Sequence, residues 1–86
     1  MSYTVEISRP AEKFLRGLTD KKLYRRLRDA LAALEGNPRP VNSVKLQSTE
    51  ELYRVRVGDY RIVYQIQDQQ LVVLVVQMGH RREIYR

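Results

Sequence analysis

Residues 52–64 read Leu52-Tyr53-Arg54-Val55-Arg56-Val57-Gly58-Asp59-Tyr60-Arg61-Ile62-Val63-Tyr64, and this stretch decides the fold. Two runs rich in β-branched and aromatic residues flank Gly58-Asp59, which is typical of a two-residue type II′ hairpin turn. A two-residue loop fixes the register, so that Arg56 faces Arg61 and the neighbouring pairs follow in step. One face of the hairpin is then apolar and predicts the core of an antiparallel sheet. It carries Tyr53, Val55, Val57, Tyr60, Ile62 and Tyr64.

The opposite face of this hairpin carries Arg54, Arg56 and Arg61. Arg56 and Arg61 lie directly across the ladder, where like charges destabilise a sheet. We therefore expect an anionic partner on this face. In the competing interpretation the face is only solvated. Its neutralising acids would be Glu50, Glu51 and Asp59.

Hydrophobic periodicity around the hairpin predicts a single α+β domain over residues 1–86. Residues 3–8 alternate between apolar and polar, as a half-buried strand does. Apolar residues then recur at helical spacing over 11–18 and over 20–35, with Pro10 in the first turn and Thr19 as the cap between the helices. Residues 36–40 (Gly-Asn-Pro-Arg-Pro) end the second helix at a glycine cap.

The expected architecture is an N-terminal strand, an antiparallel two-helix hairpin and a three-stranded antiparallel meander, with the helices packed on one sheet face. Residues 41–51 predict a loop or a ragged strand around Lys45-Leu46. Residues 71–78 predict the last strand, which returns antiparallel and brings His80 and Arg81 close to Arg56 and Arg61. The connection at 67–70 allows more than one loop length, so the register of this second hairpin stays open.

Composition excludes several classes of protein. The chain has no cysteine, which removes disulfide scaffolds and thiol chemistry. One histidine and scattered acids form no metal-ligand spacing, so no metal or other cofactor is expected. The N-terminus lacks the pattern of a signal peptide, and the longest apolar stretch, 71–76, is too short to span a bilayer. The expected location is the cytoplasm.

The charge balance points to a polyanionic partner. The formal net charge is +6, and arginine accounts for most of the basic residues. The planar guanidinium suits bidentate contact with phosphate, so nucleic acid is the first expectation. Outside the hairpin, the residues expected to grip RNA backbones are Lys21, Lys22, Arg25, Arg26, Arg28, Lys45 and Arg82. A solvated helix face accounts for the helical members of this set equally well.

The order of elements, the hairpin at 52–64 and the closing Gly79-His80-Arg81-Arg82-Glu83-Ile84-Tyr85 together resemble the RelE/ParE toxin superfamily over essentially the whole chain. The resemblance implies a toxin of a type II toxin–antitoxin pair, held inactive in a hetero-oligomer with its cognate antitoxin. RelE-like members cut messenger RNA in the ribosomal A site, whereas ParE-like members inhibit DNA gyrase and generally lack the basic catalytic set. The positions that match those used by RelE-like members are Arg54, Arg56, Arg61, Arg81 and Tyr85. The resemblance therefore favours an endoribonuclease (mRNA interferase), with gyrase inhibition and nonenzymatic RNA binding as the alternatives.

The implied reaction is attack by a ribose 2′-hydroxyl on its neighbouring phosphate, which needs no metal and leaves a 2′,3′-cyclic phosphate and a 5′-hydroxyl. Arg56 and Arg61 would stabilise the phosphoryl oxygens, while Arg54 would hold the adjacent backbone. Arg81 would contact phosphate or assist the leaving oxygen. Tyr85 would stack on a base of the codon.

One departure from the family affects the proton transfers. RelE-like enzymes commonly carry lysines where this sequence has Arg54 and Arg56, and arginine hardly deprotonates. A general-base role of lysine therefore does not carry over. His80 becomes the candidate for moving a proton, because histidine is the side chain most often used for proton transfer near neutral pH.

Overall fold

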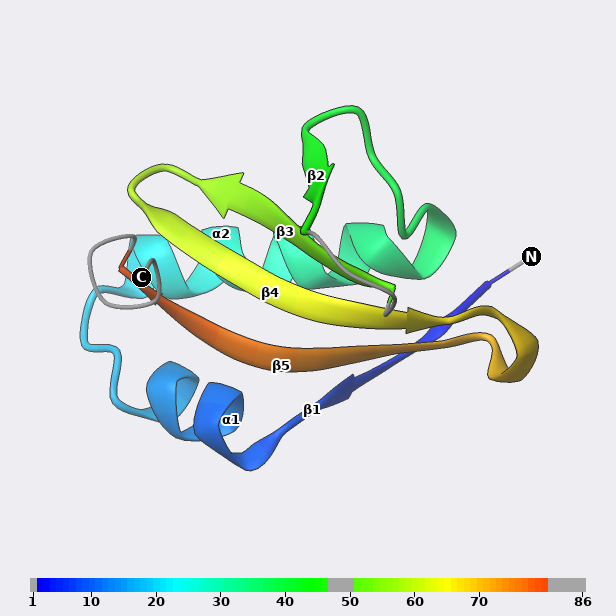
Figure 1. Cartoon of the computed structure of the whole chain (residues 1–86). Helices are drawn as coiled ribbons and strands as arrows, with labels where there is room; N and C mark the ends of the chain where they lie inside the picture. Colours follow the sequence, from blue (N-terminus) through cyan, green and yellow to red (C-terminus); the bar gives the residue numbers. More distant parts are fainter. Residues whose placement is uncertain (1, 47–50, 81–86) are drawn as a thin grey trace.

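The computed structural model describes residues 2–46 and 51–80, and it consists of one five-stranded sheet with two helices (Figure 1). The elements, in chain order, are β1 (Thr4–Ile7), α1 (Arg9–Arg16), α2 (Lys21–Gly36), β2 (Ser43–Lys45), β3 (Leu52–Val57), β4 (Tyr60–Gln67), the short 3-10 helix η1 (Asp68–Gln70) and β5 (Val72–His80). The predicted α+β class is confirmed.

The strands lie in the order β1-β5-β4-β3-β2. The predicted antiparallel meander of β3, β4 and β5 is confirmed, and two edge strands extend it. On one side, β1 pairs with β5 in parallel, which the sequence did not reveal. On the other side, β2 pairs antiparallel with β3, so residues 41–51, which the sequence predicts as a loop or a ragged strand, contain a three-residue strand.

The helices begin at side-chain caps. Ser8 caps α1, because its Oγ accepts a hydrogen bond from the Ala11 amide at 3.4 Å. The prediction that Thr19 caps the second helix is wrong. Asp20 is the cap, and its carboxylate accepts from the Leu23 amide at 3.1 Å. At the other end α2 includes Gly36, and its C-cap is Asn37 rather than the predicted glycine.

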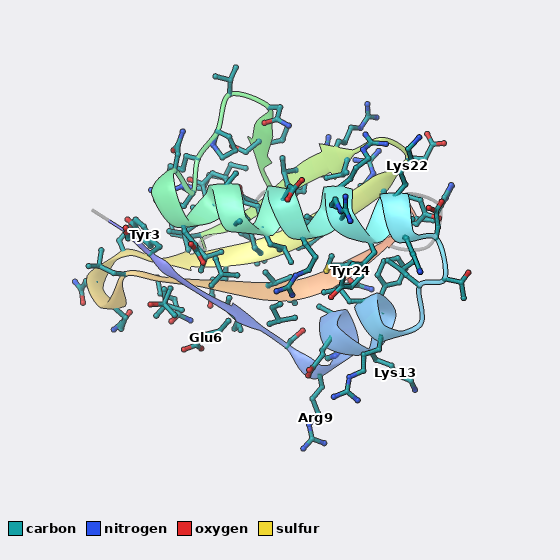
Figure 2. All side chains as sticks on the ribbon, turned by 180° about the vertical axis from the view of Figure 1, so that it is seen from behind. Tyr3, Glu6, Arg9, Lys13, Lys22 and Tyr24 are labelled. Atoms are coloured by element: carbon teal, nitrogen blue, oxygen red, sulfur yellow. The ribbon has the colours of Figure 1, made fainter. Side chains whose placement is uncertain are left out.

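One core joins both helices to one face of the sheet, as predicted. In α2 the buried residues are Leu27, Leu31 and Leu34, which recur at helical spacing. Figure 2 shows α2 crossing the sheet with α1 beside it, and each helix packs mainly on strands: α1 on β5, and α2 on β1 and β3. No helix in the described part of the chain is long and apolar enough to cross a membrane.

Candidate nucleic-acid interface

The β3–β4 hairpin presents the three arginines as the sequence predicts. Gly58 has φ +62°, the left-handed conformation that the first position of the tight turn requires. Arg56 pairs with Arg61 and Arg54 with Val63, so the predicted register is confirmed at every pair. Since the helices cover the other face of the sheet, the three arginines share the face that the helices leave open. We call this the arginine face.

The three arginines differ in exposure. Arg56 is exposed, and it forms no ion pair with any described residue. Arg54 is half-buried, whereas Arg61 is only 3% exposed. Both interact with other groups of the chain. A buried cation beside an exposed one creates a positive potential that is screened less than that of two surface charges.

The competing interpretation needs Glu50, Glu51 or Asp59 to neutralise the arginine face. Neither Glu51 nor Asp59 forms an ion pair with Arg56. Glu51 binds Arg39 and Lys45 instead. Asp59 forms no ion pair with a described residue. Glu50 lies outside the described residues. The structure therefore leaves a cation on the arginine face available to an external anion.

His80 reaches the same end of the sheet but lies on its other face. It is the cross-strand partner of Tyr60, whose side chain packs against the core under the helices. The two rings meet edge to face, with centroids 5.3 Å apart, and Tyr60 in turn contacts the ring of Phe14 at 5.9 Å. The register brings His80 close to Arg61, as predicted, because Gly79 pairs with Arg61 and His80 with Tyr60, but its side chain lies on the face opposite to that of the arginines.

The basic residues of α2 separate into two groups. Lys22 and Arg26, one turn apart, line a cleft of about 370 Å³ together with the Gly58-Asp59 turn. The Arg26 guanidinium lies over this turn, with Nη1 3.5 Å from the point where a side chain at Gly58 would begin. In Figure 2, Lys22 and Tyr24 project from opposite sides of α2. The remaining basic residues of the helix are exposed elsewhere on its surface: Lys21, Arg25 and Arg28.

A second polar cluster, which no pattern in the sequence marks, centres on Arg39 and includes Asp68 of η1, the connection that lies at the end of the sheet opposite the Gly58-Asp59 turn (Figure 1). Arg39 donates to both carboxylate oxygens of Asp68, at 2.8 and 3.3 Å, and to Glu51 at 3.2 Å. Its Nε donates to the Tyr53 hydroxyl at 3.1 Å, and Tyr3 donates to Asp68 at 2.6 Å. The members come from a helix–strand connection, two strand starts and η1, a spacing that forms no recognisable motif.

The hydrogen bonds of the Arg39 cluster shift the pKa values of three of its members. Hydrogen bonds from Arg39 hold the pKa values of Asp68 and Glu51 below their ordinary values. The hydrogen bond to Asp68 raises the pKa of Tyr3. Lys45 belongs to this cluster, since its Nζ lies 3.5 Å from Glu51 and its strand partner is Tyr53 on the helix-covered face. The structure therefore separates Lys45 from the arginine face.

Three predicted site residues, Arg81, Arg82 and Tyr85, lie outside the described residues. Among the described residues, no group of three histidine, aspartate or glutamate side chains could hold a metal ion. The described part of the site therefore consists of the hairpin arginines and the cationic start of α2.

Comparison with known proteins places this arrangement in a family. Residues 5–85 match the family described as the ParE toxin of the type II toxin–antitoxin system parDE. The toxin RelG of Mycobacterium tuberculosis is 29% identical over 86 residues, which cover 100% of this chain and 99% of that protein.

Solved structures of RelE toxins support the same family assignment. The archaeal RelE–RelB complex from Pyrococcus horikoshii contains a chain that is 32% identical, with a TM-score of 0.82 over 94% of this chain and 97% of that one. The isolated Escherichia coli RelE toxin is 27% identical, with a TM-score of 0.79 over 92% of this chain and 84% of that one. The chain therefore belongs to the RelE/ParE superfamily and is a RelE-family toxin of a type II toxin–antitoxin system.

Proposed function

We propose that this toxin is a ribosome-dependent endoribonuclease that cuts messenger RNA in the ribosomal A site. The observation that carries the proposal is the arginine face, where Arg54, Arg56 and Arg61 gather on the side of the hairpin that the helices leave open. Two directly opposed arginines cost stability in an empty sheet, and a polyanion reverses that cost. RNA phosphates supply such a charge at regular spacing.

The arginines stabilise charge during the reaction. The ribose 2′-oxygen loses its proton and bonds to the adjacent phosphorus, while the P–O5′ bond breaks and the O5′ leaving group takes up a proton. An incoming phosphate meets exposed Arg56 first, and buried Arg61 beside it contributes positive potential in a medium of lower dielectric. Arg54, two residues along β3, holds the neighbouring phosphate. Preorganised donors of this kind are typically worth about 3 kcal/mol each.

The arginine face offers these charges without an evident base. Within β3, β4 and β5 the register places no histidine, lysine or carboxylate on this face. His80 packs on Tyr60 on the other side of the sheet. The intramolecular attack therefore draws its rate mainly from alignment of the 2′-oxygen with the phosphate, which the ribosome provides, together with charge stabilisation. We assign Arg81 to the leaving oxygen and Tyr85 to base stacking, on the family resemblance alone.

We assign ribosome binding to the first turns of α2. Lys22 and Arg26 flank the turn that joins the two arginine-bearing strands. We assign contacts with ribosomal RNA to these two first. The outer helical residues Lys21, Arg25 and Arg28, together with Arg82, are assigned a weaker, salt-dependent contribution. Lys45 contributes least, because Glu51 already pairs with it.

The cognate antitoxin is the expected protein partner. The Pyrococcus relative was solved as a RelE–RelB complex, and a Mycobacterium tuberculosis relative as a toxin–antitoxin complex. By this likeness the toxin described here forms a hetero-oligomer with its own antitoxin, which keeps it inactive in the cytoplasm.

Expression of the wild-type toxin beside Arg61→Ala and Arg56→Gln tests the proposal, with messenger RNA ends and their terminal chemistry mapped in each strain. Arg16→Ala is the matched control, because Arg16 is an exposed arginine on α1 with only a surface pair to Glu12. We expect cuts within translated codons that end in a cyclic phosphate, are lost in both hairpin variants and persist in the control. Growth arrest without new RNA ends, equal in all strains, would overturn the proposal and make DNA gyrase the next target.

A further inference from the structure

A bulge in β5 decides what faces Arg61. Tyr64 pairs with Val75, but Val63 pairs with Gln77, so Val76 has no partner on β4. A regular ladder continued from Tyr64 and Val75 would put Gln77 toward the core and Met78 opposite Arg61. The bulge shifts β5 by one residue.

The shift improves burial and changes the arginine face. Met78 is buried at 4% exposure opposite Ile62, while Gln77 is exposed. Gly79 then stands opposite Arg61 on the arginine face. Side chains directly across such a ladder have Cβ atoms about 5 Å apart. A glycine there places no side chain next to Arg61, whereas the regular ladder would place a methionine there.

Ser8 holds this bulge from the other side of β5. Its amide donates to the Val75 carbonyl at 2.9 Å, and its Oγ donates to the Val76 carbonyl at 2.7 Å. Successive carbonyls of a regular strand point to opposite neighbours, so two in a row that bind one residue mark the irregularity. The same Oγ accepts from the Ala11 amide as the N-cap of α1. Ser8 therefore connects β1, α1 and the bulge.

We infer that Ser8 is a positioning residue for Arg61: by fixing the bulge at Val76 it sets the register that places Gly79, and not Met78, across from Arg61. Arg61, which is 3% exposed, therefore has a residue without a side chain as its direct partner on β5. The inference concerns the register itself, and it rests on the proposed ribonuclease function only for its consequence in RNA cleavage.

The test replaces Ser8 in three ways. Ser8→Ala removes the cap and the bond to Val76 together. Ser8→Asp keeps an acceptor for the Ala11 amide but has no donor for Val76, so it isolates the bulge from the cap. Ser8→Thr keeps both functions. Ser43→Ala is the matched control, because Ser43 also donates its Oγ to a carbonyl at 2.7 Å, that of Pro40, away from β5.

The first readout is the set of cross-strand nuclear Overhauser contacts between residue 61 and residues 78 and 79. Ser8→Ala and Ser8→Asp should lose the contact between Arg61 and Gly79, whereas Ser8→Thr and Ser43→Ala should keep it. The second readout is ribosome-dependent RNA cleavage, which should fall by about tenfold or more in the first two variants, since small misplacements of a catalytic group carry such losses. Threonine should restore it.

Persistence of the Arg61–Gly79 contact in both Ser8→Ala and Ser8→Asp overturns the inference. If Ser8→Ala does not fold, Ser8→Asp still decides. Gly79→Met in the wild-type background puts the methionine side chain of the regular ladder opposite Arg61, and its full cleavage activity would also count against the inference. If the wild-type toxin cuts no RNA, the proposed function fails while the register contacts still decide the role of Ser8.

Discussion

Replacement of Arg56 by glutamine should stabilise the free toxin while it weakens RNA cleavage. Arg56 and Arg61 are direct cross-strand partners. For an assumed separation of about 6 Å, two unit charges repel by about 0.7 kcal/mol in water and by about 3 kcal/mol at an effective dielectric constant of 20. Because Arg56 is exposed and its head can swing away, we expect a gain near the lower limit, about 0.5 kcal/mol, within the range of cross-strand pairs. For a domain of this size that gain raises the melting temperature by about 2–4 °C.

The assay is thermal unfolding of the antitoxin-free toxin at low salt and at about 1 M salt, where the Debye length is about 3 Å. Arg25→Gln is the control, because it removes the same charge from an exposed helical site that has no cross-strand arginine. The stabilisation of Arg56→Gln should exceed that of the control at low salt and shrink at high salt. A lower melting temperature, a gain no larger than the control's, or a gain that persists in high salt would refute the reasoning.

Three further predictions concern stability. Tyr64→Phe removes the buried hydroxyl that donates to the Pro38 carbonyl at 2.8 Å, and the unsatisfied carbonyl should cost about 1–2 kcal/mol in denaturant unfolding, so an unchanged midpoint would contradict this account. Gly58→Ala forces a side chain into φ +62° and should cost about 1 kcal/mol, whereas Gly58→Asn should cost less because asparagine tolerates this conformation, and equal losses would argue against strain. Arg39 lowers the pKa values of its two carboxylate partners, so their contribution is present above about pH 4 and is lost as the pH falls through their folded pKa values. Arg39→Gln should therefore flatten the acid limb of the melting temperature between about pH 2 and pH 5, and a parallel downward shift of the whole curve would contradict this assignment.

The two hairpins of the meander differ in how far the sequence determines them. The pairing of β3 with β4 follows from Gly58-Asp59, because a two-residue loop leaves one register. The pairing of β4 with β5 does not, because η1 is followed by Leu71 in the left-handed region at φ 55°, where no glycine or asparagine marks the turn. The bulge at Val76 then shifts the register once more.

The residues of the candidate site also differ in how far the sequence determines their positions. Placement of the hairpin arginines on one face needs only strand alternation, which residues 52–64 display clearly. The face on which His80 lies depends on the bulge. The sequence indicates the bulge only indirectly, because strict alternation after Val75 would bury Gln77 and expose Met78. The Arg39 cluster depends on segments that approach one another only after the sheet forms, so no local pattern predicts it.

The strand order also has a consequence for the synthesis of the toxin. β5, the last strand to be made, lies between β1 and β4, and the first strand has no partner among the described residues until β5 is present. Chains emerge at about 5–20 residues per second, so the sheet stays incomplete for several seconds, until β5 has been made. A truncated product without β5 lacks both the strand that pairs with β1 and the glycine opposite Arg61. The topology thus delays completion of the sheet, and with it the pairing of Arg61 with Gly79, until β5 has been made.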